Sequence, residues 1–175
     1  TVIFSPKYGP PNATDRDVLL MLMQLTHLHT AWRTPTIRCP LSEALALLRW
    51  SSGGSDYDRI KLSMKRWHAA TLNYQRAWWD KDRDAWVDLS LHILDSVKFR
   101  KRLGQAHRDE ETAFSWSPEF FNRCNLKVFD WDFYISLKSP ISKAAYRLLD
   151  KRFHRKPHIE FNLETFAFSK IGLSR

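Results

Sequence analysis

Residues 51–68 read SSGGSDYDRIKLSMKRWH. The serines and glycines at the start of this stretch favour a turn, and Asp56 after them can cap a helix. Ile60, Met64 and Trp67 then follow at intervals of four and three, which gives the helix one narrow apolar stripe. The remaining faces are basic. We therefore predict a helix that docks on its neighbours by the stripe and leaves a wide cationic face exposed.

The segments on either side of this stretch predict two further helices and a hairpin. Apolar residues recur at helical spacing over 14–29 and again over 41–48, with a short extended segment at 36–39 between them. From residue 72 the period changes to two, and the alternation continues to residue 93 around a polar tip at 80–84. The predicted order is helix, strand, helix, basic helix and long hairpin.

This order is that of a winged helix, an α+β fold in which a helix-turn-helix carries a β-hairpin wing. The third helix of such a fold can enter the major groove, which is about 12 Å wide, while the wing reaches the neighbouring backbone. We predict a first winged-helix domain over residues 1–111. Its predicted DNA contacts, on the third helix and the wing, are Arg59, Lys61, Lys65, Arg66, His68, Arg76, Lys81 and Arg83.

A second basic helix is the most clearly marked element of the chain. Ser139 and Pro140 form a cap and a first-turn proline, and apolar residues follow on one face. Basic residues recur at every fourth position on another face. Like charges at this spacing destabilise an isolated helix by about a few tenths of a kcal/mol each, so phosphates would stabilise it. The predicted DNA contacts here are Lys143, Arg147, Lys151, Arg152, Arg155 and Lys156.

The two halves of the sequence share one short pattern. TIRCPL at 36–41 and HIEFNL at 158–163 each stand between a long and a short helical segment, with Ile and Leu at matching positions. We therefore predict that 112–175 forms a connector strand and helix, then the first half of a second winged helix. Residues 98–108 are compatible with a basic helical connector. Since the sequence begins with Thr1 rather than Met, we expect it to be part of a longer protein.

The composition is that of a folded, basic protein. The 175 residues include 28 Lys and Arg against 19 Asp and Glu, a net charge of +9 that favours nucleic acid as the partner. Apolar residues make up 43% of the chain, too many for a disordered one. No apolar run reaches the about 18 residues that a membrane span needs. Two cysteines and the absence of a signal-peptide pattern indicate a cytoplasmic location.

Several stretches of the sequence resemble one known family. FYISLKSPI at 133–141, YRLLDKRF at 146–153 and FSWSP at 114–118 are similar to the plasmid replication initiator protein A family, and the likeness spans about residues 57–172. The resemblance implies tandem winged helices that bind origin repeats in double-stranded DNA, the first of which serves dimerisation. It also implies local duplex opening with a host replication initiator, helicase recruitment and a homodimer.

The sequence carries no pattern that predicts catalysis, a metal or a cofactor. No glycine-rich phosphate loop followed by Lys is present, and no Ser, His and Asp form a nucleophile motif. His27-Leu28-His29 is similar to the metal-binding triplet of rolling-circle nickases. That site needs both imidazoles on one face, and residues i and i+2 point about 200° apart on a helix. We therefore predict a non-enzymatic DNA-binding protein, with the nickase as a remote alternative.

Two other functions fit the same scaffold. A winged-helix transcriptional regulator shares the first domain, whereas an interaction module would use the aromatic hairpin for dimerisation. Salt-sensitive affinity for duplex DNA is expected of the first and not of the second. Four tryptophans could stack on bases, but we expect them to pack in the core or at an interface: Trp67, Trp78, Trp79 and Trp86. We expect Cys39 and Cys124 to be small buried residues.

Overall fold

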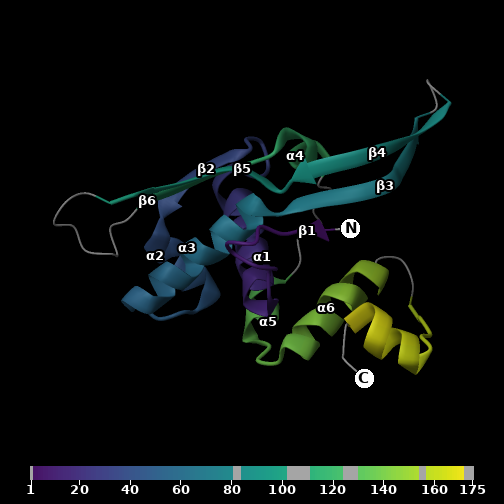
Figure 1. The fold of residues 1–175 in the computed structure, drawn as a ribbon. Coiled ribbons are helices and arrows are strands. Elements are labelled where there is room, and N and C mark those ends of the chain that lie inside the picture. Colours follow the sequence, from purple (N-terminus) through teal and green to yellow (C-terminus); the bar gives the residue numbers. More distant parts are fainter. Residues whose placement is uncertain (1, 81–83, 102–110, 124–129, 154–156, 172–175) are drawn as a thin grey trace. The chain divides into compact units, whose positions relative to one another are not determined.

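The computed structural model describes residues 2–80, 84–101, 111–123, 130–153 and 157–171. The chain divides into two units, Thr1–Asn125 and Leu126–Arg175. As the sequence predicts, the fold is of the α+β class, with helices and two three-stranded antiparallel sheets (Figure 1).

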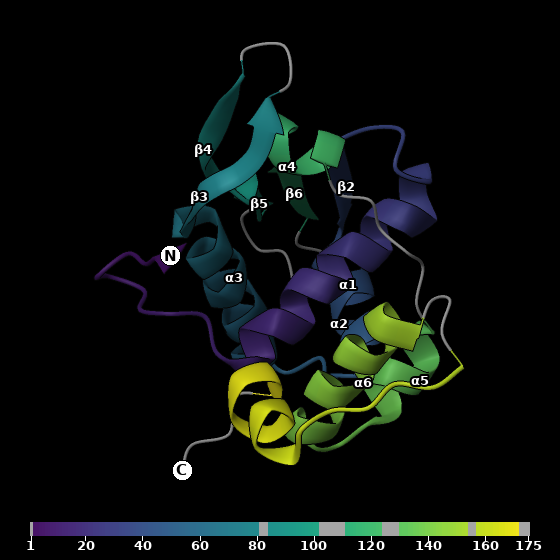
Figure 2. The same cartoon turned by 90° about the vertical axis from the view of Figure 1, so that its right-hand side faces the viewer.

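Three helices form one layer of the first unit: α1 (Ala13–Thr30), α2 (Leu41–Leu48) and α3 (Gly54–Ala69). Figure 2 shows α3 beside α1, and α1 packs on both α2 and α3. All three predicted helices are confirmed. The α3 helix begins after Gly53, earlier than the cap expected at Asp56, and its predicted stripe of Ile60, Met64 and Trp67 is buried.

A capping box starts α1. The Asn12 side chain accepts a hydrogen bond from the Asp15 backbone at 3.0 Å, and the Asp15 carboxylate accepts one from the Asn12 backbone at 2.8 Å. The helix ends at Ala31, which adopts the left-handed conformation with φ of 46°. These two signals set the ends of α1 close to the predicted range of 14–29.

The strands form two sheets, and sequence periodicity does not show which strands pair with each other. One sheet has the order β1-β3-β4 and the other β2-β6-β5. The predicted hairpin is β3–β4, which extends beyond the helices in Figures 1 and 2. The bounds are β1 (Val2–Ile3), β2 (Thr36–Pro40), β3 (Thr71–Asp80), β4 (Ala85–His92), β5 (Leu94–Arg100) and β6 (Glu111–Trp116).

Two expectations about the middle of the chain are wrong. Residues 98–100 belong to β5 rather than to a helical connector, because they pair with β6; residues 102–110 lie outside the described residues. The predicted domain boundary at residue 111 falls on the first residue of β6. Because β6 lies between β2 and β5, the first unit continues through α4 (Pro118–Arg123) to Asn125.

The core of the first unit lies between α1 to α3 and the inner face of the β2-β6-β5 sheet. Ile37 and Phe114 are a cross-strand pair on that face, and both are buried. Trp116 is 1% exposed and donates its indole N–H to the Thr26 hydroxyl of α1 at 2.8 Å. Its ring stacks on Trp32, at a centroid distance of 5.7 Å. A strand far along the sequence is thereby fixed to the first helix.

The described residues of the second unit form two α-helices and one short π-helix: α5 (Trp131–Ser136), α6 (Pro140–Arg152) and η3 (Thr165–Ile171). The Ser139 side chain caps α6, with Pro140 in its first turn, as predicted. The match of HIEFNL at 158–163 to TIRCPL, which contains β2, would place a strand here, but none is present among the described residues. A strand needs a pairing partner, and the described part of this unit contains no other strand.

The reactivity of Cys39 on β2 tests whether the inner face of its sheet is buried. Burial and then the nearby Glu43 carboxylate raise the pKa of this thiol to about 12. At pH 8 only about one thiol in ten thousand is then ionised. In a Cys124→Ser variant, we expect Cys39 to resist a disulfide reagent at pH 8 until denaturant is added. Rapid reaction in native buffer would contradict the burial.

The raised pKa of Cys39 also determines how the stability of the fold changes with pH. Since the folded state holds the Cys39 proton more tightly than the unfolded state, this group stabilises the fold fully below about pH 9 and loses that contribution as the pH rises towards 12.

In the part of the chain that the structure describes, no helix combines the length and apolar character needed to cross a bilayer.

Candidate nucleic-acid interface

Arg66, one of the predicted DNA contacts, is a structural residue of the α1–α3 interface. Its guanidinium lies 3.0 Å from the Asp15 carboxylate, and its Nε donates to the Tyr8 carbonyl oxygen at 2.7 Å. The Asp15 side chain is 3% exposed and that of Arg66 is 22% exposed. Trp67 donates its indole N–H to the Asp15 carbonyl oxygen. The Arg66 charge is therefore compensated within the fold.

The other cations of α3 differ in their surroundings. Arg59 stacks on Trp50, with its guanidinium carbon 4.4 Å from the ring centroid, and donates to the Thr14 hydroxyl at 3.0 Å. Lys61 is half-buried. Lys65 is exposed, and its Nζ lies 5.9 Å from the Phe99 ring centroid. On this helix, Lys65 is thus the predicted contact best placed to meet an anion, and Arg59 presents a half-exposed guanidinium.

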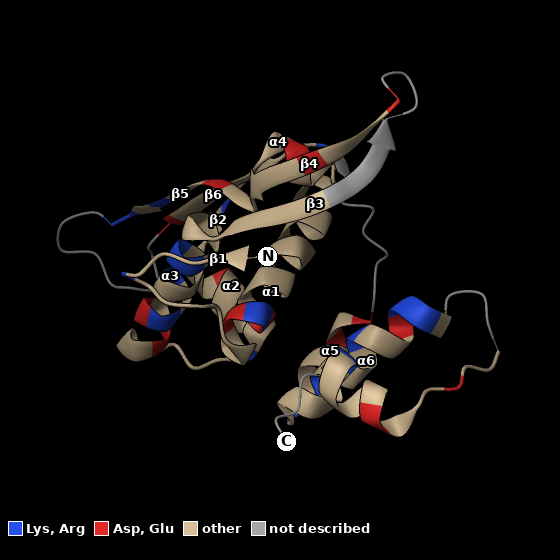
Figure 3. Ribbon diagram, turned by 45° about the vertical axis from the view of Figure 1, so that its right-hand side comes forward, with Lys and Arg blue, Asp and Glu red and all other residues tan. Residues whose placement is uncertain are grey.

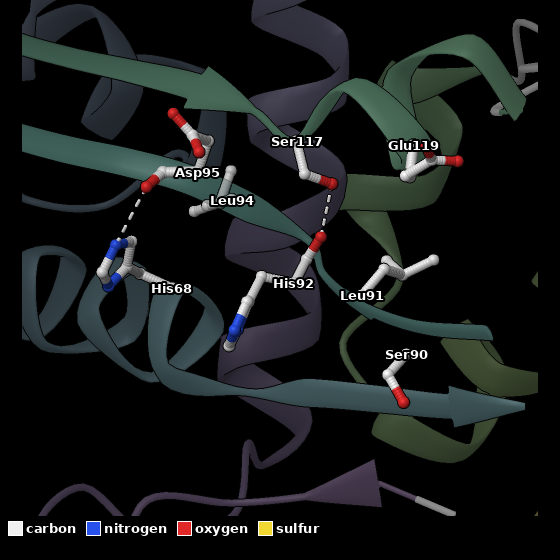
Figure 4. Close-up of a pocket in the computed structure, with 8 residues that line it drawn as sticks. All are labelled: His68, Ser90, Leu91, His92, Leu94, Asp95, Ser117 and Glu119. Carbon is white, nitrogen blue, oxygen red and sulfur yellow. Dashed lines mark hydrogen bonds between the residues drawn. The ribbon is translucent and has the colours of Figure 1, made fainter.

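His68, the last predicted contact on α3, lines a pocket of about 270 Å³ (Figure 4). Its Nε2 lies 3.1 Å from the Asp95 carbonyl oxygen, so the ring donates from Nε2. Across the pocket, the Ser117 hydroxyl donates to the His92 carbonyl oxygen. The first bond joins the end of α3 to β5, which gives His68 a positioning role in the fold, and the second joins the start of α4 to β4.

The hairpin contacts are largely beyond what the structure describes. Arg76 lies on β3, but its side chain, like residues Lys81 and Arg83, falls outside the described part. The four tryptophans that we expect to pack in the core or at an interface differ in their exposure. Trp67 is buried in the core, whereas Trp86 on β4 is 54% exposed and lies outside the core, so its packing at an interface stays a prediction. The side chains of Trp78 and Trp79, and residue Cys124, are likewise outside the described part.

The basic ridge of α6 is only partly exposed. Arg147 donates to the Tyr134 hydroxyl at 2.7 Å, and the Lys143 Nζ lies 5.1 Å from the centroid of the same ring. Both cations are half-buried, and Tyr134 is fully buried. Lys151 and Arg152 in the last turn are exposed, and Figure 3 shows blue at this end of α6. The predicted contacts Arg155 and Lys156 lie outside the described residues.

Three exposed basic residues that are not among the predicted DNA contacts lie together on one sheet. Arg38 on β2 and Lys98 on β5 both flank Ala113 on β6, and Arg100 lies beside Glu111 in the next row. The alternation of Ile37, Arg38 and Cys39 predicts that Arg38 faces outward. No local signal shows that residues 38 and 98 belong to one sheet, because their shared partner is β6.

The two histidines of the nickase-like triplet lie on a helix. His27 and His29 both lie on α1, and the His29 Nε2 lies 2.7 Å from the Glu43 carboxylate. Positions i and i+2 of a helix do not share a face. Among the residues that the structure describes, no three His, Cys, Asp or Glu side chains form a group that could hold a metal.

Comparison with solved structures identifies the fold. A crystal structure of domains 2–3 of RctB has a TM-score of 0.66 with 14% sequence identity, over 85% of this chain and 57% of that chain. A selenomethionine derivative of domains 2 and 3 of RctB has a TM-score of 0.62 with 13% identity, over 92% of this chain and 67% of that chain. The chain thus spans little more than half of the first of these structures.

Sequence comparison identifies the family. The chain matches no curated protein by sequence. The family model described as "Replication initiator protein A" matches residues 1–172, which is nearly the whole sequence and a longer range than the 57–172 expected from the resemblance. The match includes both structural units. The chain therefore belongs to the replication initiator protein A family.

Proposed function

We propose that this protein binds double-stranded DNA at the repeats of a plasmid replication origin and acts by binding rather than by catalysis. Its role in initiation would then be to mark and help open the origin, with a host replication initiator and a helicase as later partners and a homodimer as one functional form. Family membership and the net charge of +9 support this proposal.

We further propose that the first unit contains a winged helix. The helices α1, α2 and α3, the strand β2 and the hairpin β3–β4 follow one another in the order of that fold. One feature is unusual, because β2 pairs with β6 rather than with the hairpin. In the second unit, α6, residues 158–162 and η3 would correspond to the opening half of another winged helix.

The observation that carries the DNA-binding proposal is the exposed basic end of α6. Lys151 and Arg152 are neighbours in its last turn, and no described carboxylate lies within the 4.0 Å ion-pair distance of either. Both cations interact favourably with the helix C-terminus, which leaves their outward N–H groups for phosphate oxygens. Lys65 on α3 provides a further exposed cation in the first unit.

Alanine at both Lys151 and Arg152 tests the proposal. We expect the variant to bind an origin duplex at least about tenfold more weakly, and its plot of log Kobs against log salt to be shallower by about 0.9 for each phosphate that it no longer neutralises. Alanine suits a helix, so α6 should remain folded. Fluorescence anisotropy at two or more salt concentrations measures both quantities, and circular dichroism checks the fold.

The double variant Lys7→Ala, Arg16→Ala is the matched control. It removes the same charge from exposed positions before and within the first turns of α1. The proposal is wrong if the two double variants lose the same affinity, or if the unmodified protein shows no salt-sensitive binding. Equal loss on origin and scrambled duplexes would assign these residues to phosphate contacts rather than to base recognition.

A further inference from the structure

The outer face of the β2-β6-β5 sheet is a distinct basic surface. The inner face is covered, since α1 and α2 pack on β2 and α3 packs on β5. The cross-strand register places Arg38, Ala113 and Lys98 in one row of the opposite face, and Pro40, Glu111 and Arg100 in the next. Thr36, Ser115 and Ser96 form the third row. We call the group Arg38, Lys98 and Arg100 the basic sheet face.

The cations of the basic sheet face have no compensating partner in the described structure. All three are exposed, and no described carboxylate lies within the 4.0 Å ion-pair distance of any of them. This includes Glu111, which is exposed and lies across from Arg100 in the strand register. Three positive charges and one negative charge thus share a small area of exposed sheet.

The side chains at the centre of the basic sheet face are small. Its middle strand contributes Ala113 and Ser115, and the Ser115 hydroxyl lies 3.0 Å from that of Thr36. Because neighbouring strands are about 4.8 Å apart, Arg38 and Lys98 flank Ala113 with their Cα atoms about 10 Å from each other. Two long cationic side chains on either side of small residues allow a polyanion to approach the sheet closely.

We propose that the basic sheet face binds the phosphate backbone of duplex DNA, as a contact surface separate from α3 and α6. Charge complementarity identifies the partner as a polyanion. The nine residues of the three rows include no aromatic side chain, whereas sites for single-stranded nucleic acid combine basic residues with aromatic platforms for stacking. The contact is sequence-independent, since phosphates carry no base identity.

This inference rests on the proposed function and extends it. A contact of this kind would increase the affinity for every duplex and fix the orientation of the first unit on the DNA, while base recognition stays with other residues. Arg38 and Lys98 lie 60 positions apart in the sequence, so the surface exists only when the sheet is complete.

The test is the triple variant Arg38→Gln, Lys98→Gln, Arg100→Gln, in which glutamine retains part of each side-chain stem. We expect the slope of log Kobs against log salt for a scrambled duplex to become shallower by about 0.9 for each phosphate left without a cation, or about 2.7 for three. The ratio of affinities for origin and scrambled duplexes should stay within about twofold. Anisotropy titrations of the whole chain measure both, and a urea midpoint close to that of the unmodified protein confirms folding.

The matched control is Lys7→Gln, Arg16→Gln, Lys170→Gln, which removes three exposed charges elsewhere. The inference is overturned if the two triple variants give the same slope, or if the sheet variant loses affinity only for single-stranded DNA. It is also overturned if the sheet variant changes the sedimentation coefficient and not the salt slope, since the face is then an interface between copies. Failure of the unmodified protein to bind any duplex would instead refute the proposed function.

Discussion

Replacing Asp15 with alanine is expected to lower the free energy of unfolding by about 3 to 5 kcal/mol, the range found when one partner of a buried ion pair is removed. Asp15 is almost completely buried and accepts two hydrogen bonds from Arg66. The same carboxylate closes the capping box of α1 with Asn12. Its loss therefore leaves Arg66 without its carboxylate partner and also removes one of the two hydrogen bonds of the capping box.

A double-mutant cycle separates these two contributions. Urea denaturation of Asp15→Ala, Arg66→Ala and the double variant should give a coupling energy of about 0.5 to 3 kcal/mol. Asp58→Ala is the control, because Asp58 is an exposed carboxylate on α3, and it should change stability by about 0.5 kcal/mol or less. If Asp15→Ala is no more destabilising than Asp58→Ala, the ion pair does not hold α1 to α3.

Replacing Trp116 with alanine is expected to destabilise the first unit by about 3 to 5 kcal/mol. The ring is 1% exposed and has aromatic neighbours on several sides. It stacks on Trp32 and Phe120 and meets Phe114 edge to face. Truncation leaves a cavity at the junction of β6, α1 and α4, and it leaves the Thr26 hydroxyl without its indole donor.

Trp86→Ala provides a control of identical chemistry at an exposed position. Because 54% of Trp86 is accessible, this change should cost far less, about 1 kcal/mol or below. Trp116→Phe should fall between the two, since it keeps much of the aromatic packing and loses the hydrogen bond to Thr26, worth about 1 kcal/mol. Thermal or urea unfolding followed by circular dichroism measures all three. Equal losses for Trp116→Ala and Trp86→Ala would refute the packing role.

Local signals in the sequence were sufficient to predict the helices. The spacing of Ile60, Met64 and Trp67 predicts the buried face of α3, and Ser139 with Pro140 predicts the start of α6. Each of these signals lies within a few residues of what it determines, since capping and amphipathic packing act over one or two helical turns. The hairpin β3–β4 is equally local, because its two strands are consecutive.

The sheet β2-β6-β5 could not be predicted in the same way. Residues 36–40 of β2 pair with residues 111–115 of the central strand β6. Periodicity shows that a segment is extended without showing which segment it pairs with. The segment 98–100 is compatible with a helix when considered alone, and only its pairing with β6 makes it a strand. The domain boundary at residue 111 is wrong for the same reason.

The candidate site shows the same limit at the level of single side chains. A count of basic residues on α3 treats Arg66 and Lys65 alike, yet one is paired with Asp15 and the other is exposed. On α6, Lys143 and Arg147 contact Tyr134, a residue of the preceding helix. Charge patterning gives the number of cations on a helix, whereas tertiary packing determines which of them remain exposed to a phosphate.

The central position of β6 also has a consequence for synthesis on the ribosome. When α1, β2 and α2 have emerged, β2 has no strand beside it, because residues 111–116 have still to be translated. Until then, the buried side of β2, with Ile37 and Cys39, lacks Phe114 and Trp116. The nascent chain therefore carries an open strand edge for the time needed to add about seventy amino acids, and a chaperone that shields such an edge would act within this interval.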